Sequence, residues 1–308
     1  MNKKRNFSWK NFFSKWYILI ILALIYIPLI FIIFLSFNEG SPIKGNINTK
    51  FDHWTVVNYL TLFSNPAFTH SLTASLIVAS IVVPTSVILA VMVCFGMWSN
   101  WKGYSKLVLS ISNVSIAIPS VINGIALVIL FTFTWIPMGF GFGYLTIIFA
   151  QVSFATPYAI VFIYPKLQKF DMNLLLASQD LGYTRIKTFW KIVFPYLLPS
   201  ILLSSTIVFT QSFDDYVITS LVEGRVSVIA VNLYTMNKGI QVWAVTFGAI
   251  VMFITFFIVI VRTCIVASKE QIRKNKDKKI ILQRMHKMTF NKIKLLHNKQ
   301  RKELSKSV

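Results

Sequence analysis

The stretch LLLASQDLGYTRIKTFWKIVFPYLLPSI, Leu174–Ile201, interrupts a strongly apolar chain and has the pattern of two short helices joined at a glycine. Leu174–Leu181 predicts the first helix, and Gly182 is placed to end it in a left-handed conformation. Thr184 can cap a second helix, Arg185–Phe194. The pattern predicts a helix–glycine–helix elbow.

The second predicted helix carries an apolar stripe of Phe189, Trp190 and Val193. Pro195 and Pro199 follow and are expected to mark where the next membrane span begins. An elbow with aromatic anchors is typical of a docking element. An amphipathic link lying on lipid headgroups would have the same pattern, so the residues alone leave both readings open.

The chain around the elbow is too apolar for a water-soluble domain. Hydrophobic residues make up 55% of the sequence and charged residues 13%, whereas soluble domains carry roughly 25% charged residues. About 20 apolar residues suffice for a helix to cross a bilayer. Six runs are long enough: Trp16–Phe37, Ser71–Trp98, Leu107–Trp135, Tyr144–Tyr164, Tyr196–Leu221 and Trp243–Val266. The expected fold is an all-α integral membrane protein with about six transmembrane helices.

The distribution of positive charge predicts the orientation of these spans. Of the 31 Lys and Arg residues, 27 lie in the segments on the same side as the N-terminus and 4 lie on the other side. Because positively charged loops stay in the cytoplasm, both ends of the chain are expected on the cytoplasmic side of the cell membrane. The net charge of +21 therefore reflects topology rather than a nucleic-acid-binding face.

These patterns divide the chain into three predicted parts. Residues 1–15 form a basic cytoplasmic N-terminus, residues 16–266 hold the six helices, and residues 267–308 form a basic cytoplasmic tail. Within the helical part, residues 165–195 form a cytoplasmic loop that contains the elbow. The Lys-rich tail is expected to lie against anionic membrane lipid.

Known catalytic and metal-binding patterns are missing from the sequence. It has no phosphate-binding loop, no HExxH and no GxSxG motif. The two cysteines, Cys94 and Cys264, are far apart in apolar runs, so a disulfide or metal site is not expected. We expect no enzymatic activity, no catalytic residue and no cofactor.

The elbow resembles the EAA loop of the permeases of ABC importers. The matching positions include Ala177, Asp180, Leu181, Gly182 and Phe189. Leu176 stands where that motif usually has glutamate. The resemblance implies a type I ABC-importer permease fold, in which these five residues couple the helices to a separate ATP-hydrolysing subunit.

Three further stretches are similar to the spermidine/putrescine permeases of that superfamily: Ile118–Phe131, Phe149–Leu167 and Gln211–Gly224. The resemblance implies a polyamine importer of the bacterial cell membrane. It also implies three kinds of protein partner: a second permease subunit, cytoplasmic ATPase subunits and an extracellular solute-binding protein or lipoprotein.

Two adjacent carboxylates, Asp214 and Asp215, are the candidate substrate contacts. They follow Pro195 by 19 and 20 residues, roughly 28–30 Å along a helix, which predicts a place near the outer mouth of the pathway. A polyamine is a flexible apolar chain with ammonium groups, and Phe213 and Tyr216 add aromatic surface beside the carboxylates. Alternatively, the aspartates cap the helix end or contact the extracellular binding protein.

Other polar residues and prolines leave more than one reading open. Gln151 and Asn123 could line the pathway or bond between helices. Pro119 and Pro157 are expected to kink the third and fourth spans, although packing alone can explain proline there.

Two other functions remain as alternatives. An ABC permease for another small solute would share the elbow, but the two aspartates disfavour an anion. An ion-gradient-driven transporter would require ionisable residues at the middle of several spans, and the sequence has none there.

Overall fold

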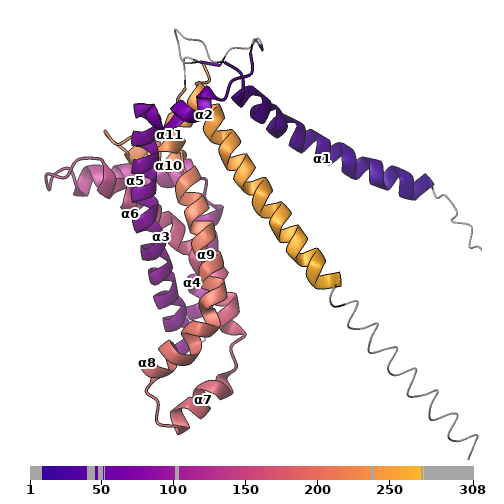
Figure 1. Cartoon of the computed structure of the whole chain (residues 1–308). Coiled ribbons are helices and arrows are strands. Elements are labelled where there is room, and N and C mark those ends of the chain that lie inside the picture. The colour runs from indigo at the N-terminus through magenta and orange to yellow at the C-terminus, as the bar shows by residue number, and fades with distance from the viewer. Residues whose placement is uncertain are drawn as a thin grey trace, which may run out of the picture. The chain divides into compact units, whose positions relative to one another are not determined.

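The computed structural model describes residues 9–39, 46–47, 51, 53–100, 104–236, 239–271 and 273. Within these residues the regular structure is helical, with isolated bridges at Asn38–Trp54 and Asn46–Gln241. The elements are α1 (Trp9–Ser36), α2 (Val57–Thr61), η1 (Leu62–Ser64), α3 (Pro66–Asn100), α4 (Tyr104–Ala117), α5 (Ser120–Thr134), α6 (Tyr144–Gln168), α7 (Met172–Asp180), α8 (Arg185–Thr188), the π-helical turn η2 (Phe189–Val193), α9 (Phe194–Asp214), α10 (Val217–Val222) and α11 (Ile229–Tyr234). A last helix spans Val242–Gln271 (Figure 1).

Five helices are long and apolar enough to cross a membrane, and a sixth span results if the bent pair α4–α5 counts as one. The predicted all-α membrane fold is therefore confirmed. The bend expected at Pro119 in the third run, Leu107–Trp135, is confirmed, and it is a full break: α4 and α5 meet at an angle of 101°. Pro119 causes this break: it has no N–H to donate, and its ring disfavours helical geometry at Ile118.

The boundary predicted at Pro195 is wrong. The second helix of the elbow does not end at Phe194 but continues through η2 into α9, giving one helical run from Arg185 to Asp214. In η2 the N–H of Phe194 bonds to the carbonyl of Phe189, five residues back. Pro195 has no backbone N–H and so cannot donate a helical hydrogen bond. The wider π turn interrupts the regular pattern of α-helical hydrogen bonds directly before this residue.

The described chain divides into two compact units. One unit is Phe37–Thr246, and the other comprises the residues up to Ser36 and those from Phe247. In the second unit, α1 contacts the last helix, where the ring of Tyr26 lies 6.2 Å from that of Phe256. Residues 1–8, 272 and 274–308 lie outside the described residues, and so does most of the predicted basic tail.

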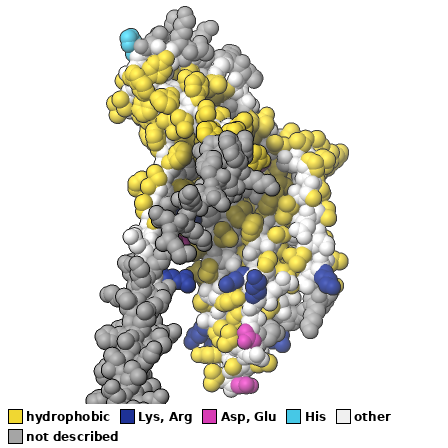
Figure 2. All heavy atoms as spheres, turned by 90° about the vertical axis from the view of Figure 1, so that its right-hand side faces the viewer, with side chains coloured by type: hydrophobic (Ala, Val, Ile, Leu, Met, Phe, Trp, Pro, Cys, Tyr) yellow, Lys and Arg dark blue, Asp and Glu magenta, His cyan; other side chains and the backbone are white. Residues whose placement is uncertain are grey.

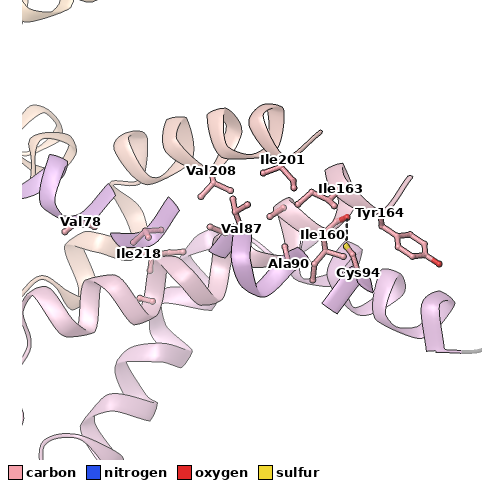
Figure 3. Close-up of a cluster of buried hydrophobic side chains, with 14 of the residues drawn as sticks. Val78, Val87, Ala90, Cys94, Ile160, Ile163, Tyr164, Ile201, Val208 and Ile218 are labelled. Atoms are coloured by element: carbon pink, nitrogen blue, oxygen red, sulfur yellow. Dashed lines mark hydrogen bonds between the residues drawn. The ribbon is translucent and has the colours of Figure 1, made fainter. Parts of the chain in front are cut away.

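The core of the Phe37–Thr246 unit lies between α3, α6 and α9, which pack on one another. Figure 3 shows apolar side chains from these three helices meeting, together with Ile218 of α10. Small residues, Ala90 on α3 and Ala159 on α6, are completely buried, and small side chains allow helices to approach closely. This bundle fixes the elbow at one end of the unit and α10 and α11 at the other (Figure 1).

Candidate functional site

A cavity of about 820 Å³ lies where the break between α4 and α5 faces α6 and the end of α9. The residues around it are mostly apolar or aromatic, with a polar group at the α9 end. They are Ile116, Ala117, Ile118, Pro119, Ser120, Phe154, Tyr158, Thr206, Ile207, Thr210, Gln211, Asp214, Asp215, Tyr216, Val217 and Tyr234. Of the four predicted pathway residues, the cavity brings together Asp214, Asp215 and Tyr216.

The two aspartates differ in what they bind. Asp215 follows the last residue of α9, and its carboxylate accepts a hydrogen bond from the backbone N–H of Ile218 at 3.3 Å. It accepts a second bond from the hydroxyl of Thr219 at 2.9 Å. Burial raises the pKa of Asp215, and these bonds oppose that rise. Asp215 thus connects the end of α9 to the start of α10, as the helix-end alternative expected.

Asp214 is exposed and has no hydrogen bond or ion pair with the described part of the chain. Its carboxylate is therefore available for a cation in the cavity. Tyr216 lies beside it and stacks on Tyr234, with ring centroids 4.7 Å apart and planes at 20°. Phe213 is not part of the cavity lining and stacks instead on Phe209, one helical turn earlier, at 5.5 Å.

Gln151 bonds between helices. Its amide donates to the hydroxyl of Thr219 at 2.9 Å, and its carbonyl accepts from the hydroxyl of Ser212 at 2.6 Å. These bonds tie α6 to both α9 and α10, so Gln151 fixes the frame that holds Asp215. Asn123 lines a second cavity of about 210 Å³ with Ser115 and Ser153.

The sequence reasoning missed Gln211 and Tyr234. Gln211 lines the main cavity, and its side-chain carbonyl oxygen is buried with no hydrogen-bond partner in the described part of the chain. A helical period of three places Gln211 on the same face as Asp214, and this signal could have identified it. Tyr234 reaches the cavity from α11, and no local sequence pattern connects it to residues near 214.

The elbow has the predicted local geometry. Gly182 has φ +79°, and its N–H bonds to the carbonyl of Gln179 at 2.9 Å. The N–H of Tyr183 bonds to the carbonyl of Ser178 at 3.0 Å, which completes a Schellman ending of α7. The hydroxyl of Thr184 accepts from the N–H of Lys187 and caps α8.

Side-chain contacts hold the elbow together and connect it to the bundle. The hydroxyls of Ser178 and Thr188 bond to each other at 2.8 Å in a buried position between α7 and α8. The ring of Phe189 lies 4.4 Å from that of Phe95 on α3. The elbow is therefore joined to α3 by this ring contact as well as to α9 by the continuous helix.

The outer surface of the elbow is strongly apolar. Leu181 is 79% exposed, Ile186 70% and Trp190 59%, and Leu176 is exposed as well. Ala177 and Asp180 are also exposed. On the face that Figure 2 shows, Lys, Arg and acidic side chains of the main body gather near its lower end, where Figure 1 places α7 and α8. Exposed apolar side chains rimmed by charge are typical of a protein-docking surface.

Residues 83–269 match the family model described as "Binding-protein-dependent transport system inner membrane component". The chain is 45% identical over 253 residues to a spermidine/putrescine transport system permease protein PotC homolog of Mycoplasma pneumoniae, covering 80% of this chain and 88% of that protein. The corresponding Mycoplasma genitalium homolog is 41% identical, with 88% and 95% covered.

One more distant relative and one solved structure are also similar to this chain. The putrescine transport system permease protein PotI of Escherichia coli K12 is 30% identical, over 68% of this chain and 75% of that one. A solved bacterial ABC transporter that imports alginate matches with a TM-score of 0.60 and 13% identity, over 85% of this chain and 98% of the matched chain. This last likeness shows the fold alone.

Proposed function

Since the chain belongs to the family of binding-protein-dependent transport system inner membrane components, a family of multi-pass ABC permease subunits, we propose that it carries polyamines, spermidine and putrescine, into the cell. The observation that carries this proposal is the cavity beside Asp214. It combines a carboxylate that has no partner among the described residues with the stacked rings of Tyr216 and Tyr234. Such a site suits an ammonium group, since a carboxylate and aromatic faces both attract cations.

The energy for import comes from separate subunits. The elbow residues Ala177, Asp180, Leu181, Gly182 and Phe189 dock on a cytoplasmic ATPase, and its closure moves α3 and α9. The exposed apolar surface around Leu181 supports this role, because it would otherwise face water. A second permease subunit completes the pathway, and an extracellular solute-binding protein delivers the substrate.

In the membrane both ends of the chain face the cytoplasm. The elbow then lies inside, and α10 and α11, which follow the cavity residues Asp214 and Asp215, lie toward the outer surface, in keeping with the opposite ends of the Phe37–Thr246 unit at which Figure 1 shows these helices. Alternating access requires the cavity to open outward and inward in turn, driven from the elbow.

The test is uptake of labelled spermidine and putrescine by vesicles containing the complete transporter, with ATP supplied on the cytoplasmic side. Gly182→Pro is compared with Gly139→Pro. Both glycines have positive φ, +79° and +85°. In each the N–H bonds to the carbonyl three residues back, Gln179 and Ile136. The two substitutions therefore cause the same local damage at different places.

ATP-dependent uptake that is lost with Gly182→Pro and kept with Gly139→Pro supports both the substrate and the coupling role of the elbow. Absence of polyamine uptake by the wild-type transporter refutes the substrate. Uptake that survives Gly182→Pro and follows an ion gradient refutes the coupling to ATP.

A further inference from the structure

The two neighbouring aspartates of the cavity are not equivalent, although the sequence gives no reason to distinguish them. Both oxygens of Asp215 are engaged, one with the N–H of Ile218 and the other with the hydroxyl of Thr219. Thr219 in turn accepts from Gln151 on α6. Asp215 is therefore part of a hydrogen-bonded frame, and a ligand that took its carboxylate would have to break that frame.

The free acceptors of the cavity lie on one face of α9. Gln211 and Asp214 are three residues apart on this helix, so their side chains are neighbours. The carbonyl oxygen of Gln211 is buried and has no partner within the described residues, and Asp214 has none either. A buried acceptor without a partner is unfavourable, and a ligand N–H in the cavity would supply the missing bond.

We propose that Gln211 and Asp214 together hold one ammonium group of the transported cation, and that Asp215 is a positioning residue. The assignment rests on the proposed function and deepens it. An ammonium has three N–H donors and no acceptor. It can donate to the Gln211 carbonyl and to the Asp214 carboxylate at once, and the carboxylate supplies the opposite charge.

The rest of the cavity fits the remainder of such a molecule. Phe154 and Ile207 offer apolar surface to methylene groups, and Tyr216 presents a ring beside the charged end. The class of substrate is thus a linear primary amine whose terminal ammonium is followed by a methylene chain. A quaternary ammonium lacks N–H donors and would leave the Gln211 carbonyl unpaired.

The experiment measures polyamine uptake against substrate concentration by the complete transporter in vesicles, with Vmax normalised to the amount of protein inserted. Gln211→Leu and Asp214→Asn are each expected to raise KM at least about tenfold, the effect of losing a hydrogen bond to a charged group. Gln271→Leu, at the end of the last helix, is the matched control and leaves KM unchanged.

A variant with exchanged positions separates binding from folding. Gln211→Glu combined with Asp214→Asn moves the carboxylate by three residues along the same face, and it is expected to recover most of the affinity lost with Asp214→Asn alone. Asp215→Asn is expected to lower the melting temperature of the purified transporter and to leave the KM of the remaining folded protein within about threefold of the wild type.

The assignment is overturned if Gln211→Leu and Asp214→Asn leave KM unchanged in a transporter whose wild type takes up polyamines. It is also overturned if Asp215→Asn alone raises KM as much as Asp214→Asn does. A wild-type transporter without polyamine uptake would refute the proposed function and this assignment with it.

Discussion

The ring of Phe189, in the π-helical turn between α8 and α9, lies 4.4 Å from the ring of Phe95 on α3, with the planes inclined at 59°. The two residues are far apart in the sequence, and they join the elbow to the longest helix of the core. Phe189 also contacts Trp190 and Phe194. The elbow therefore has a lateral connection to the bundle besides its covalent continuation into α9.

Removing either ring of this pair should weaken the transfer of motion from the elbow. We expect Phe189→Ala and Phe95→Ala to lower the number of substrate molecules transported per ATP hydrolysed, with ATP hydrolysis retained. A double-mutant cycle on the free energy of unfolding should give a coupling energy between the two rings of about 0.5–1.5 kcal/mol, the range for aromatic pairs. Phe133→Ala, which truncates an exposed ring on α5, is the control. Unchanged stoichiometry in both variants would contradict the prediction.

Gly124 on α5 allows α10 to approach closely. A Cβ atom at this position would lie 2.6 Å from Cδ1 of Leu221. We expect Gly124→Ala to destabilise the unit by less than about 1 kcal/mol, because the clashing atom is the tip of a partly exposed leucine side chain that can turn away. The second substitution Leu221→Ala should restore stability in the double variant. Gly96→Ala is the control, because nothing lies within 4 Å of the added atom there. Melting temperatures of the purified protein test this, and failure of Leu221→Ala to suppress the defect would disprove it.

We predict that the stability of the protein depends on pH through the side chain of Glu223. It is half-buried in the loop after α10, one of its oxygens has no partner in the described part of the chain, and burial raises its pKa to about 7 from an ordinary value of 4.5. Between these values the folded state holds a proton that the unfolded state has lost, so stability falls as pH rises from about 4.5 to 7. Above about pH 7 the carboxyl of Glu223 is ionised in both states, and stability does not fall further through this group.

The check is to melt the wild type and Glu223→Gln at pH 5 and pH 8. The glutamine variant lacks the titrating group, so it should be the more stable protein at pH 8 and should show a smaller difference between the two conditions. An equal pH dependence in both proteins would assign the effect to another group.

Gln151 should be essential for the junction of α9 and α10. Gln151→Leu leaves the hydroxyl of Ser212 without its acceptor and removes a donor to Thr219. We expect a loss of about 2–4 kcal/mol, since buried polar groups would lose their partners. Asn123→Leu is the comparison, because that amide faces a small cavity and has no hydrogen bond to the described residues. Equal loss in both variants would show that any leucine is harmful at this depth.

Local chemistry was sufficient for the elbow and for most spans. The ending of the first elbow helix needs a positive φ, which Gly182 allows, and Thr184 has a hydroxyl that can cap the second. Long apolar runs form helices in lipid because their backbone hydrogen bonds must be satisfied within the segment. The residues themselves encode these properties. The resemblance to ABC-importer permeases also came from the sequence of the elbow, and the comparisons confirmed the family; the role of the elbow residues stays a prediction.

Contacts between distant segments decided the rest. The sequence placed Asp214 and Asp215 side by side and allowed either to cap a helix end. In the structure α9 ends between them, so Asp215 takes the local bonds to Ile218 and Thr219, while Asp214 has no partner among the described residues. Gln151 from α6, far away in the sequence, then holds Thr219. Similarly, Pro119 and Pro195 look alike in the sequence, yet the helix breaks by 101° at one and continues through a π turn at the other. A residue's type fixes which bonds it can make, whereas the partners within reach depend on helices brought together from elsewhere in the chain.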